Sequence, residues 1–138
     1  MPGELLYLDS SALVKLVIVE PESGPLAEAL TDWPAQVSSI VATVEIRRAA
    51  RRAAAAPAVN ARADQVAAQL GLVFLTPEVA REAAEIRPHG LRSLDAIHLA
   101  SALSLGDDLG GYATYDARLA SAAETLGLKV IAPGEAGI

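Results

Sequence analysis

Apolar positions follow two different periods along this chain, and the changes of period divide it into short strands and longer helices. Short apolar runs between Gly, Pro or polar residues indicate buried strands, and apolar residues at every third or fourth position indicate amphipathic helices. We expect strands over residues 5–8, 35–38, 72–75, 112–114 and 128–131. We expect helices over residues 12–19, 26–33, 40–55, 57–70, 77–87, 94–105 and 117–126. Strands that alternate with helices through short connections predict an α/β fold, a parallel sheet with helices on both faces.

Length and composition narrow this picture to one domain. A chain of 138 residues is long enough for one well-covered core and too short for two. The hydrophobic fraction is 52% but aromatic residues make up only 4%, so the core must consist mainly of closely packed Ala, Leu, Val and Ile. We expect a single domain over residues 1–138, with a tail from about residue 133.

Cysteine content and the first residues bear on the compartment. The sequence has no Cys, which excludes disulfides, thiolate metal ligands and a thiol nucleophile, and fits a reducing cytoplasm. The start lacks the basic region of a signal peptide. Asp9 and Lys15 interrupt the following apolar run before the roughly 18 residues that a membrane span requires. We expect a cytoplasmic protein without a membrane partner.

The net charge of −6 argues against a nucleic-acid partner, because phosphate binding normally requires a basic surface. Four arginines nevertheless fall within one predicted helix, at positions 47, 48, 51 and 52. Acids that converge on divalent cations would also have their charge cancelled locally. The overall charge therefore leaves an RNA substrate open.

Two carboxylates lie where the predicted structure changes between strand and helix. Asp9 follows the apolar strand 5–8, and Asp116 precedes the helix 117–126. Each fits a helix N-cap, where a side-chain oxygen accepts hydrogen bonds from free amides; Ser10 or Ser11 is an alternative cap for the first helix. Each also fits a site, because open α/β sheets bind ligands at the carboxyl ends of their strands.

Two further carboxylates lie on predicted helices. Glu45 borders an apolar helix face beside Arg48 and Arg52, so it either forms a surface pair with Arg48 or points toward the sheet edge. Asp95 belongs to a helix that is apolar on nearly every side, and we expect it to be largely buried. A buried carboxylate needs a partner, either first-turn amides, Arg92 or a metal ion.

The two histidines give a weaker signal. His98 has an apolar helical setting that favours a core or supporting role over that of a ligand or base, and His89 is expected in a loop. Neither has a Ser or Cys partner at a suitable spacing for a nucleophilic triad. No glycine-rich phosphate loop follows a predicted strand.

Four features occur together in a defined order. They are an apolar strand ending in Asp9-Ser10-Ser11, Glu45 within a helix, the run Leu-Asp-Ala-Ile-His-Leu-Ala at 94–100, and Thr-Tyr-Asp-Ala-Arg-Leu at 114–119. Together they closely resemble the PIN-domain ribonucleases, and more narrowly the VapC-type toxins of bacterial toxin–antitoxin pairs. The resemblance extends from about residue 5 to residue 133. It implies a PIN-like three-layer fold with four to five parallel strands and an acidic pocket at the carboxyl side of the sheet.

The resemblance also implies roles for individual residues. The metal-binding acids would be Asp9, Glu45, Asp95 and Asp116. Supporting hydroxyls would be Ser10, Ser11 and Thr114. Candidates for RNA contacts are Lys15, Arg48, Arg52 and Arg92. The metal would be Mg²⁺ or Mn²⁺, which prefer oxygen ligands and keep several waters, and the partners would be RNA, a cognate antitoxin and a second copy of the chain.

These observations favour a metal-dependent endoribonuclease toxin that cleaves RNA phosphodiester bonds and is neutralised by an antitoxin. One alternative is a non-catalytic PIN-like scaffold that binds RNA or protein. Another is a signalling domain with Asp9 as phosphoacceptor. Such a domain requires a second acid near the acceptor, but position 11 is Ser11. It also requires a lysine that follows the end of a strand, and neither lysine of this chain lies at such a position.

Overall fold

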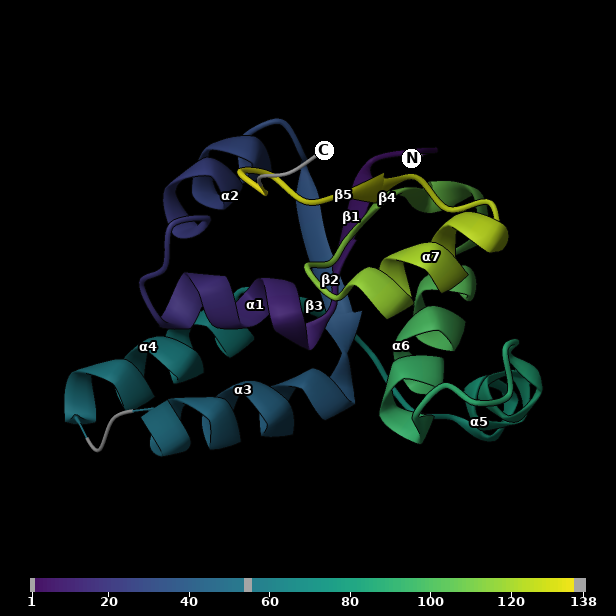
Figure 1. Cartoon of the computed structure of the whole chain (residues 1–138), viewed down its shortest axis with the longest axis horizontal. Coiled ribbons are helices and arrows are strands. Elements are labelled where there is room, and N and C mark those ends of the chain that lie inside the picture. Colours follow the sequence, from purple (N-terminus) through teal and green to yellow (C-terminus); the bar gives the residue numbers. More distant parts are fainter. Residues whose placement is uncertain (1, 54–55, 136–138) are drawn as a thin grey trace.

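The computed structural model describes residues 2–53 and 56–135, which form an α/β domain (Figure 1). Its strands are β1 (Leu5–Leu8), β2 (Ala35–Ser39), β3 (Gly71–Val73), β4 (Leu109–Ala113) and β5 (Val130–Ile131). Its helices are α1 (Ser10–Val17), α2 (Ser23–Leu30), α3 (Ile40–Ala53), α4 (Pro57–Ala68), α5 (Pro77–Glu85), α6 (Ser93–Leu103) and α7 (Ala117–Thr125), with a short 3₁₀ helix η1 (Gly106–Asp108) before β4. The expected end of the third helix at residue 55 lies outside the described residues.

The five strands form one parallel sheet in the order β3-β2-β1-β4-β5, which confirms the predicted α/β fold. The chain builds β2 and β3 on one side of β1 and then crosses to build β4 and β5 on the other. The direction of winding therefore reverses between β1 and β4. Ligands in open α/β sheets bind at the carboxyl ends of the strands beside such a reversal.

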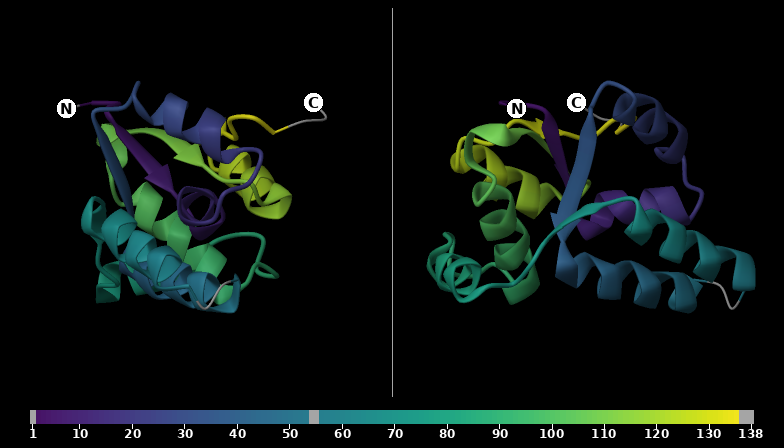
Figure 2. Two further views of the ribbon diagram at one scale, coloured as in Figure 1. Left: turned by 90° about the vertical axis from the view of Figure 1, so that its left-hand side faces the viewer. Right: turned by 180° about the vertical axis from the view of Figure 1, so that it is seen from behind.

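Each face of the sheet carries its own layer of helices. Side chains alternate along β1, so Leu6 and Leu8 face one layer while Tyr7 faces the other. The leucines pack with residues of α1 to α4, and Tyr7 packs with residues of α5, α6 and α7. Figures 1 and 2 show these helix groups on opposite sides of the sheet. The predicted three-layer arrangement is confirmed.

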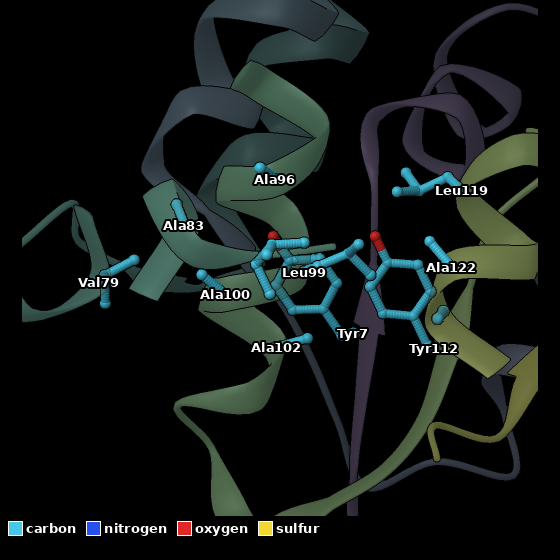
Figure 3. Close-up of a cluster of buried hydrophobic side chains, with 12 residues drawn as sticks. Tyr7, Val79, Ala83, Ala96, Leu99, Ala100, Ala102, Tyr112, Leu119 and Ala122 are labelled. Carbon is cyan, nitrogen blue, oxygen red and sulfur yellow. The ribbon is translucent and has the colours of Figure 1, made fainter. Parts of the chain in front are cut away.

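Two tyrosines form the centre of the layer that includes α6 and α7. The rings of Tyr7 and Tyr112 stack with centroids 5.2 Å apart and an angle of 7° between their planes (Figure 3). Alanines from α5, α6 and α7 surround them, including Ala83, Ala100 and Ala122. These small side chains let the helices lie close to the sheet, as the low aromatic content predicted.

Several element boundaries differ from the sequence-based prediction; the third strand, for example, ends at Val73, and Phe74 and Leu75 are exposed. Two of the differences have a clear physical cause. Strand β4 begins at Leu109 because Gly110 belongs to the strand: a Cβ there would lie 2.1 Å from the Gly3 carbonyl oxygen and 2.6 Å from the Trp33 ring. The glycines thus permit close packing and do not form a loop. Helix α2 begins before the expected position because Pro25 fits its first turn, where an amide needs no partner within the helix.

The expected C-terminal tail is partly described. The Tyr115 hydroxyl donates a hydrogen bond of 2.8 Å to the Pro133 carbonyl, so residues 133–135 lie against the domain. Residues 136–138 lie outside the described part of the chain. Among the helices that the structure describes, none has both the length and the apolar character needed to cross a membrane.

Candidate active site

The carboxyl ends of β1 and β4 bring two sequence-distant segments side by side. Asp9 follows β1, and its backbone N–H donates to the Ala113 carbonyl, 3.2 Å away, at the end of β4. Thr114 is the next residue after β4. This juxtaposition places Asp9 and Thr114 where the winding of the sheet reverses, as the parallel topology requires.

Asp9 is buried, with 1% of its surface exposed, and is held by three donors. Its Oδ1 accepts from the Ser11 hydroxyl at 2.6 Å and from the Ala12 amide at 3.1 Å, while Oδ2 accepts from the Thr114 hydroxyl at 2.6 Å. Asp9 is thus the N-cap of α1, and the alternative of Ser10 or Ser11 as cap is wrong. Burial raises the pKa of Asp9 despite these donors.

Asp116 is the predicted N-cap of α7 and connects to Asp9 through one side chain. Its Oδ1 accepts from the amides of Arg118 and Leu119 at 2.9 and 3.1 Å. The Asp116 amide donates to the Thr114 hydroxyl at 3.1 Å, and the same hydroxyl donates to Asp9. Thr114 therefore fixes the positions of both acids, while the Asp116 side chain stays at the surface.

Glu45 reaches the same edge of the sheet from α3. Its Oε1 accepts a hydrogen bond from His98 Nε2 at 2.7 Å and another from the Ser10 hydroxyl. The alternative of a surface pair with Arg48 is therefore wrong, because the carboxylate turns toward α6. Burial opposes the ionisation of Glu45, but the hydrogen bonds from His98 and Ser10 outweigh it, and its pKa is lowered.

Asp95 is half-buried, which corrects the expectation that it is largely buried. Helix α6 begins at Ser93, so Asp95 lies in its first turn, at the open edge of the sheet. Burial raises the Asp95 pKa, as do the charges of Asp116 and Glu45, and Arg92 opposes them. The ionisation of Asp95 therefore depends on the charges of Asp116 and Glu45.

His98, expected as a core or supporting residue, contacts Glu45, and the sequence did not predict this partner. It is 2% exposed, and both ring nitrogens have partners: Nδ1 lies 2.7 Å from the Tyr7 hydroxyl, and Nε2 contacts Glu45. The spacing of three residues between Asp95 and His98 could have indicated that His98 faces the site, because residues three apart lie on the same helix face.

The predicted hydroxyls and acids thus form two hydrogen-bonded groups, with Asp95 coupled to both. The first group joins Asp9, Ser11, Thr114 and Asp116. The second joins Glu45, Ser10 and His98. Within the described residues, no set of three or more His, Cys, Asp or Glu side chains is close enough to hold a metal ion directly.

A buried hydroxyl without a partner lies near these acids. Tyr112 is completely buried, and among the described residues its hydroxyl oxygen has no hydrogen-bond partner. Burial raises the pKa of Tyr112 well above its usual value, and the nearby charges of Asp9, Asp95 and Asp116 add to the shift. The hydroxyl therefore stays protonated and is a free donor beside the carboxylates.

The four basic candidates have different surroundings. Lys15 pairs with Glu22 at 2.9 Å and with Glu20 at 3.4 Å, and its ammonium lies 5.1 Å from the centre of the Tyr115 ring. These carboxylates compete with any phosphate for the Lys15 ammonium, which makes Lys15 a weak candidate for RNA contact. Arg92 is exposed immediately before α6.

Arg48 and Arg52 border a surface groove of about 410 Å³ that Glu45 also lines. Its apolar lining includes Val44 and Leu94, which are 57% and 44% exposed. The groove thus joins two cationic side chains to an apolar surface and leads to a carboxylate of the candidate site.

Comparisons with known sequences identify the family of the chain. Residues 6–125 match the family model described as PIN domain. The chain is 46% identical to Ribonuclease VapC46 of Mycobacterium tuberculosis strain ATCC 25618 / H37Rv, over 93% of this chain and 97% of that protein. It is 42% identical to Ribonuclease VapC35 of the same species, over 96% of this chain and 99% of the relative.

Solved structures share the fold at low sequence identity. The crystal structure of Mycobacterium tuberculosis VapC20, described as a sarcin-ricin loop cleaving toxin, matches with a TM-score of 0.72 and 15% identity, covering 93% of this chain and 99% of that one. A VapBC2 complex from Rickettsia felis, bound to a DNA fragment from its promoter, matches with a TM-score of 0.69 and 12% identity, covering 93% and 98%.

Proposed function

Because the chain belongs to the PIN-domain family, we propose that it is a metal-dependent endoribonuclease and the toxin of a toxin–antitoxin pair. The observation that carries the proposal is the network at the carboxyl edge of the sheet: Thr114 joins Asp9 to Asp116, and the charges of Asp116 and Glu45 act on Asp95. Full-length relatives named as ribonucleases support RNA as the substrate. Asp9 is too deeply buried to favour the phosphoacceptor alternative.

The residues at the site fit Mg²⁺ or Mn²⁺ as the cofactor. All the candidate ligands are carboxylate oxygens, which these ions prefer. Mg²⁺ keeps several of its waters, so the carboxylates need not all coordinate it directly, which suits acids that are spread apart. The Tyr112 hydroxyl has no acceptor among the described residues, so it can donate to an oxygen of a ligand that binds between these acids.

The protein's own groups prepare the site for hydrolysis. A bound divalent cation would supply an activated water and offset the charge that develops on the phosphodiester. Asp9 is held by Ser11, Ala12 and Thr114, so its carboxylate cannot rotate away. Glu45 stays ionised at neutral pH and, among the described contacts, uses only Oε1, so Oε2 is available to a water or cation.

Arg48 and Arg52 are proposed to bind the phosphates next to the scissile bond. Glu45 also lines the groove they border, and its exposed apolar residues Val44 and Leu94 offer a surface for a nucleobase. Phosphate contacts of this kind add to affinity and weaken with salt. They would give an acidic protein a local surface for RNA.

The second proposed partner is a cognate antitoxin. The fold matches a structure titled as a toxin–antitoxin complex from Klebsiella pneumoniae with a TM-score of 0.64. A short reading frame beside the gene, encoding a protein that forms a complex with this chain and stops its RNA cleavage, would support this role. We also propose a homodimer, which sedimentation of the purified protein would test.

Purified protein should cleave RNA in Mn²⁺ or Mg²⁺ and lose this activity in EDTA. Asp9→Asn and Asp95→Asn should each abolish cleavage while the far-ultraviolet circular dichroism spectrum stays that of the folded protein. Arg47→Ala is the matched control, because Arg47 pairs with Asp64 at 2.7 Å away from the acids. Cleavage that persists undiminished in both Asn variants would disprove the proposed site.

A further inference from the structure

His98 connects two structural layers that meet at the candidate active site. It lies on α6, whereas Glu45 lies on α3, across the carboxyl edge of the sheet. The two side chains are 53 positions apart in sequence, yet their Nε2 and Oε1 atoms are 2.7 Å apart. On its other side, His98 contacts Tyr7 of the central strand β1.

The direction of each hydrogen bond follows from the chemistry of the partners. An ionised carboxylate can only accept, so His98 Nε2 must carry the proton and donate to Glu45. A neutral imidazole then has no proton on Nδ1, which accepts instead. The Tyr7 hydroxyl lies 2.7 Å away, and because a phenol carries its proton at neutral pH, it donates to Nδ1.

We propose that His98 is a positioning residue, and that the buried chain of hydrogen bonds from Tyr7 through His98 to Glu45 holds the Glu45 carboxylate at the acidic pocket. The inference deepens the proposed nuclease function and rests on it for its catalytic consequence. Tyr7 is fixed by its stack on Tyr112 and His98 by burial, so this chain of hydrogen bonds starts in the packed core.

The position of Glu45 shows why such a support is needed. Its side chain is 26% exposed and extends from a helix with exposed residues on both sides of it, Val44 and Arg47. Without His98, the hydrogen bond from Ser10 would be its remaining support among the described residues. Glu45 could then adopt other rotamers, and fewer molecules would present a carboxylate to the cation or the attacking water.

Kinetic measurements on matched variants test the proposal. His98→Phe keeps the ring volume and removes the donor, and kcat for RNA cleavage should fall about 10–100-fold with little change in KM. His98→Gln retains an N–H at the position of Nε2 and should recover most of this loss. Tyr7→Phe leaves His98 in place and should lower kcat about threefold to tenfold. His89→Phe, at the only other histidine, should match the wild type.

Two readouts do not depend on cleavage. In ¹⁵N NMR spectra of His89→Phe protein, which leaves His98 as the single histidine, the proton should reside on Nε2. His98→Phe should weaken Mn²⁺ binding about tenfold in the wild-type background and less than twofold in Glu45→Gln protein, because its effect passes through Glu45.

The outcomes separate the nuclease function from the positioning role of His98. Wild-type protein that binds Mn²⁺ but cuts no RNA would refute the nuclease function, and the tautomer and the binding cycle would still decide the role of His98. A proton on Nδ1, equal losses in the Phe and Gln variants, or additive effects of His98→Phe and Glu45→Gln would overturn the proposal. If His98→Phe does not fold, Tyr7→Phe tests the positioning role instead. A Tyr7→Phe protein with the kcat of the wild type would overturn the proposal.

Discussion

Thr114→Val is the substitution that most directly tests how Asp9 and Asp116 are held together. The Thr114 hydroxyl donates to Asp9 at 2.6 Å and accepts from the Asp116 amide at 3.1 Å. Valine keeps the shape of threonine but removes both interactions. A hydrogen bond to a charged group contributes about 1.5–3 kcal/mol, and the second lost contact adds to this, so we expect a loss of about 3 kcal/mol in the free energy of unfolding.

The loss should depend on pH. Burial already raises the folded-state pKa of Asp9 above its unfolded value of about 4, so ionised Asp9 opposes folding at neutral pH, and the protein gains stability as the pH falls through the folded-state pKa. Removing the Thr114 donor raises this pKa further, because that donor favours the ionised form. The cost of Thr114→Val is therefore largest at neutral pH and shrinks as Asp9 becomes protonated.

Urea denaturation in EDTA at pH 7.5 and near pH 4, the unfolded-state pKa of an aspartate, measures both effects, and at pH 7.5 the loss should also lower Tm by roughly 10 °C. Thr43→Val is the matched control: Thr43 is also buried, but its hydroxyl donates to the neutral Ile40 carbonyl at 2.7 Å. This control should cost about 1 kcal/mol at both pH values. Equal losses for Thr114→Val and Thr43→Val, or a Thr114→Val loss that does not change with pH, would refute the reasoning.

Three further predictions concern the cation, the surface and the core. Mn²⁺ at about 100 times its Kd should stabilise the wild type by about 2.7 kcal/mol, seen as a higher Tm, and Asp95→Asn should lose most of this gain. Arg47→Ala should change the free energy of unfolding by less than about 0.5 kcal/mol in urea titrations, because the Arg47–Asp64 pair is largely exposed, and a larger loss would contradict this. Leu99→Ala should cost about 2–5 kcal/mol in the same titrations, since Leu99 is completely buried, and a near-neutral result would show that the core relaxes around it.

The features that could be predicted from sequence depend on short-range patterns. Strand β1 was recognisable as an apolar run that ends at Asp9, and α7 as an amphipathic stretch with Asp116 at its N-cap. Alternation of strands and helices then leaves few arrangements other than a parallel sheet, because parallel strands need a crossover between them. Asp9 and Asp116 could be placed because each lies at the boundary of one of these predicted elements.

The features that were missed depend on contacts between distant segments. Gly3 and Trp33 lie close to the Gly110 backbone, so a side chain has no space there. The sequence around Gly110 does not show which distant residues pack against it. Glu45 turns away from Arg48 because a buried histidine 53 positions later offers a donor. Helical periodicity gives the direction of a side chain around its own helix, but not the partner that the fold brings to it.

Asp9 caps α1 and is also a proposed metal ligand, and its hydrogen bonds determine whether one side chain can do both. A carboxylate offers about four lone-pair positions, two on each oxygen. Among the described residues, Ser11 and Ala12 occupy both positions of Oδ1, and Thr114 occupies one position of Oδ2. One position, on Oδ2, remains for a cation. Asp9 can therefore cap α1 and bind a metal through a single oxygen at the same time, and the burial that raises its pKa in the metal-free protein also favours the arrival of a compensating positive charge.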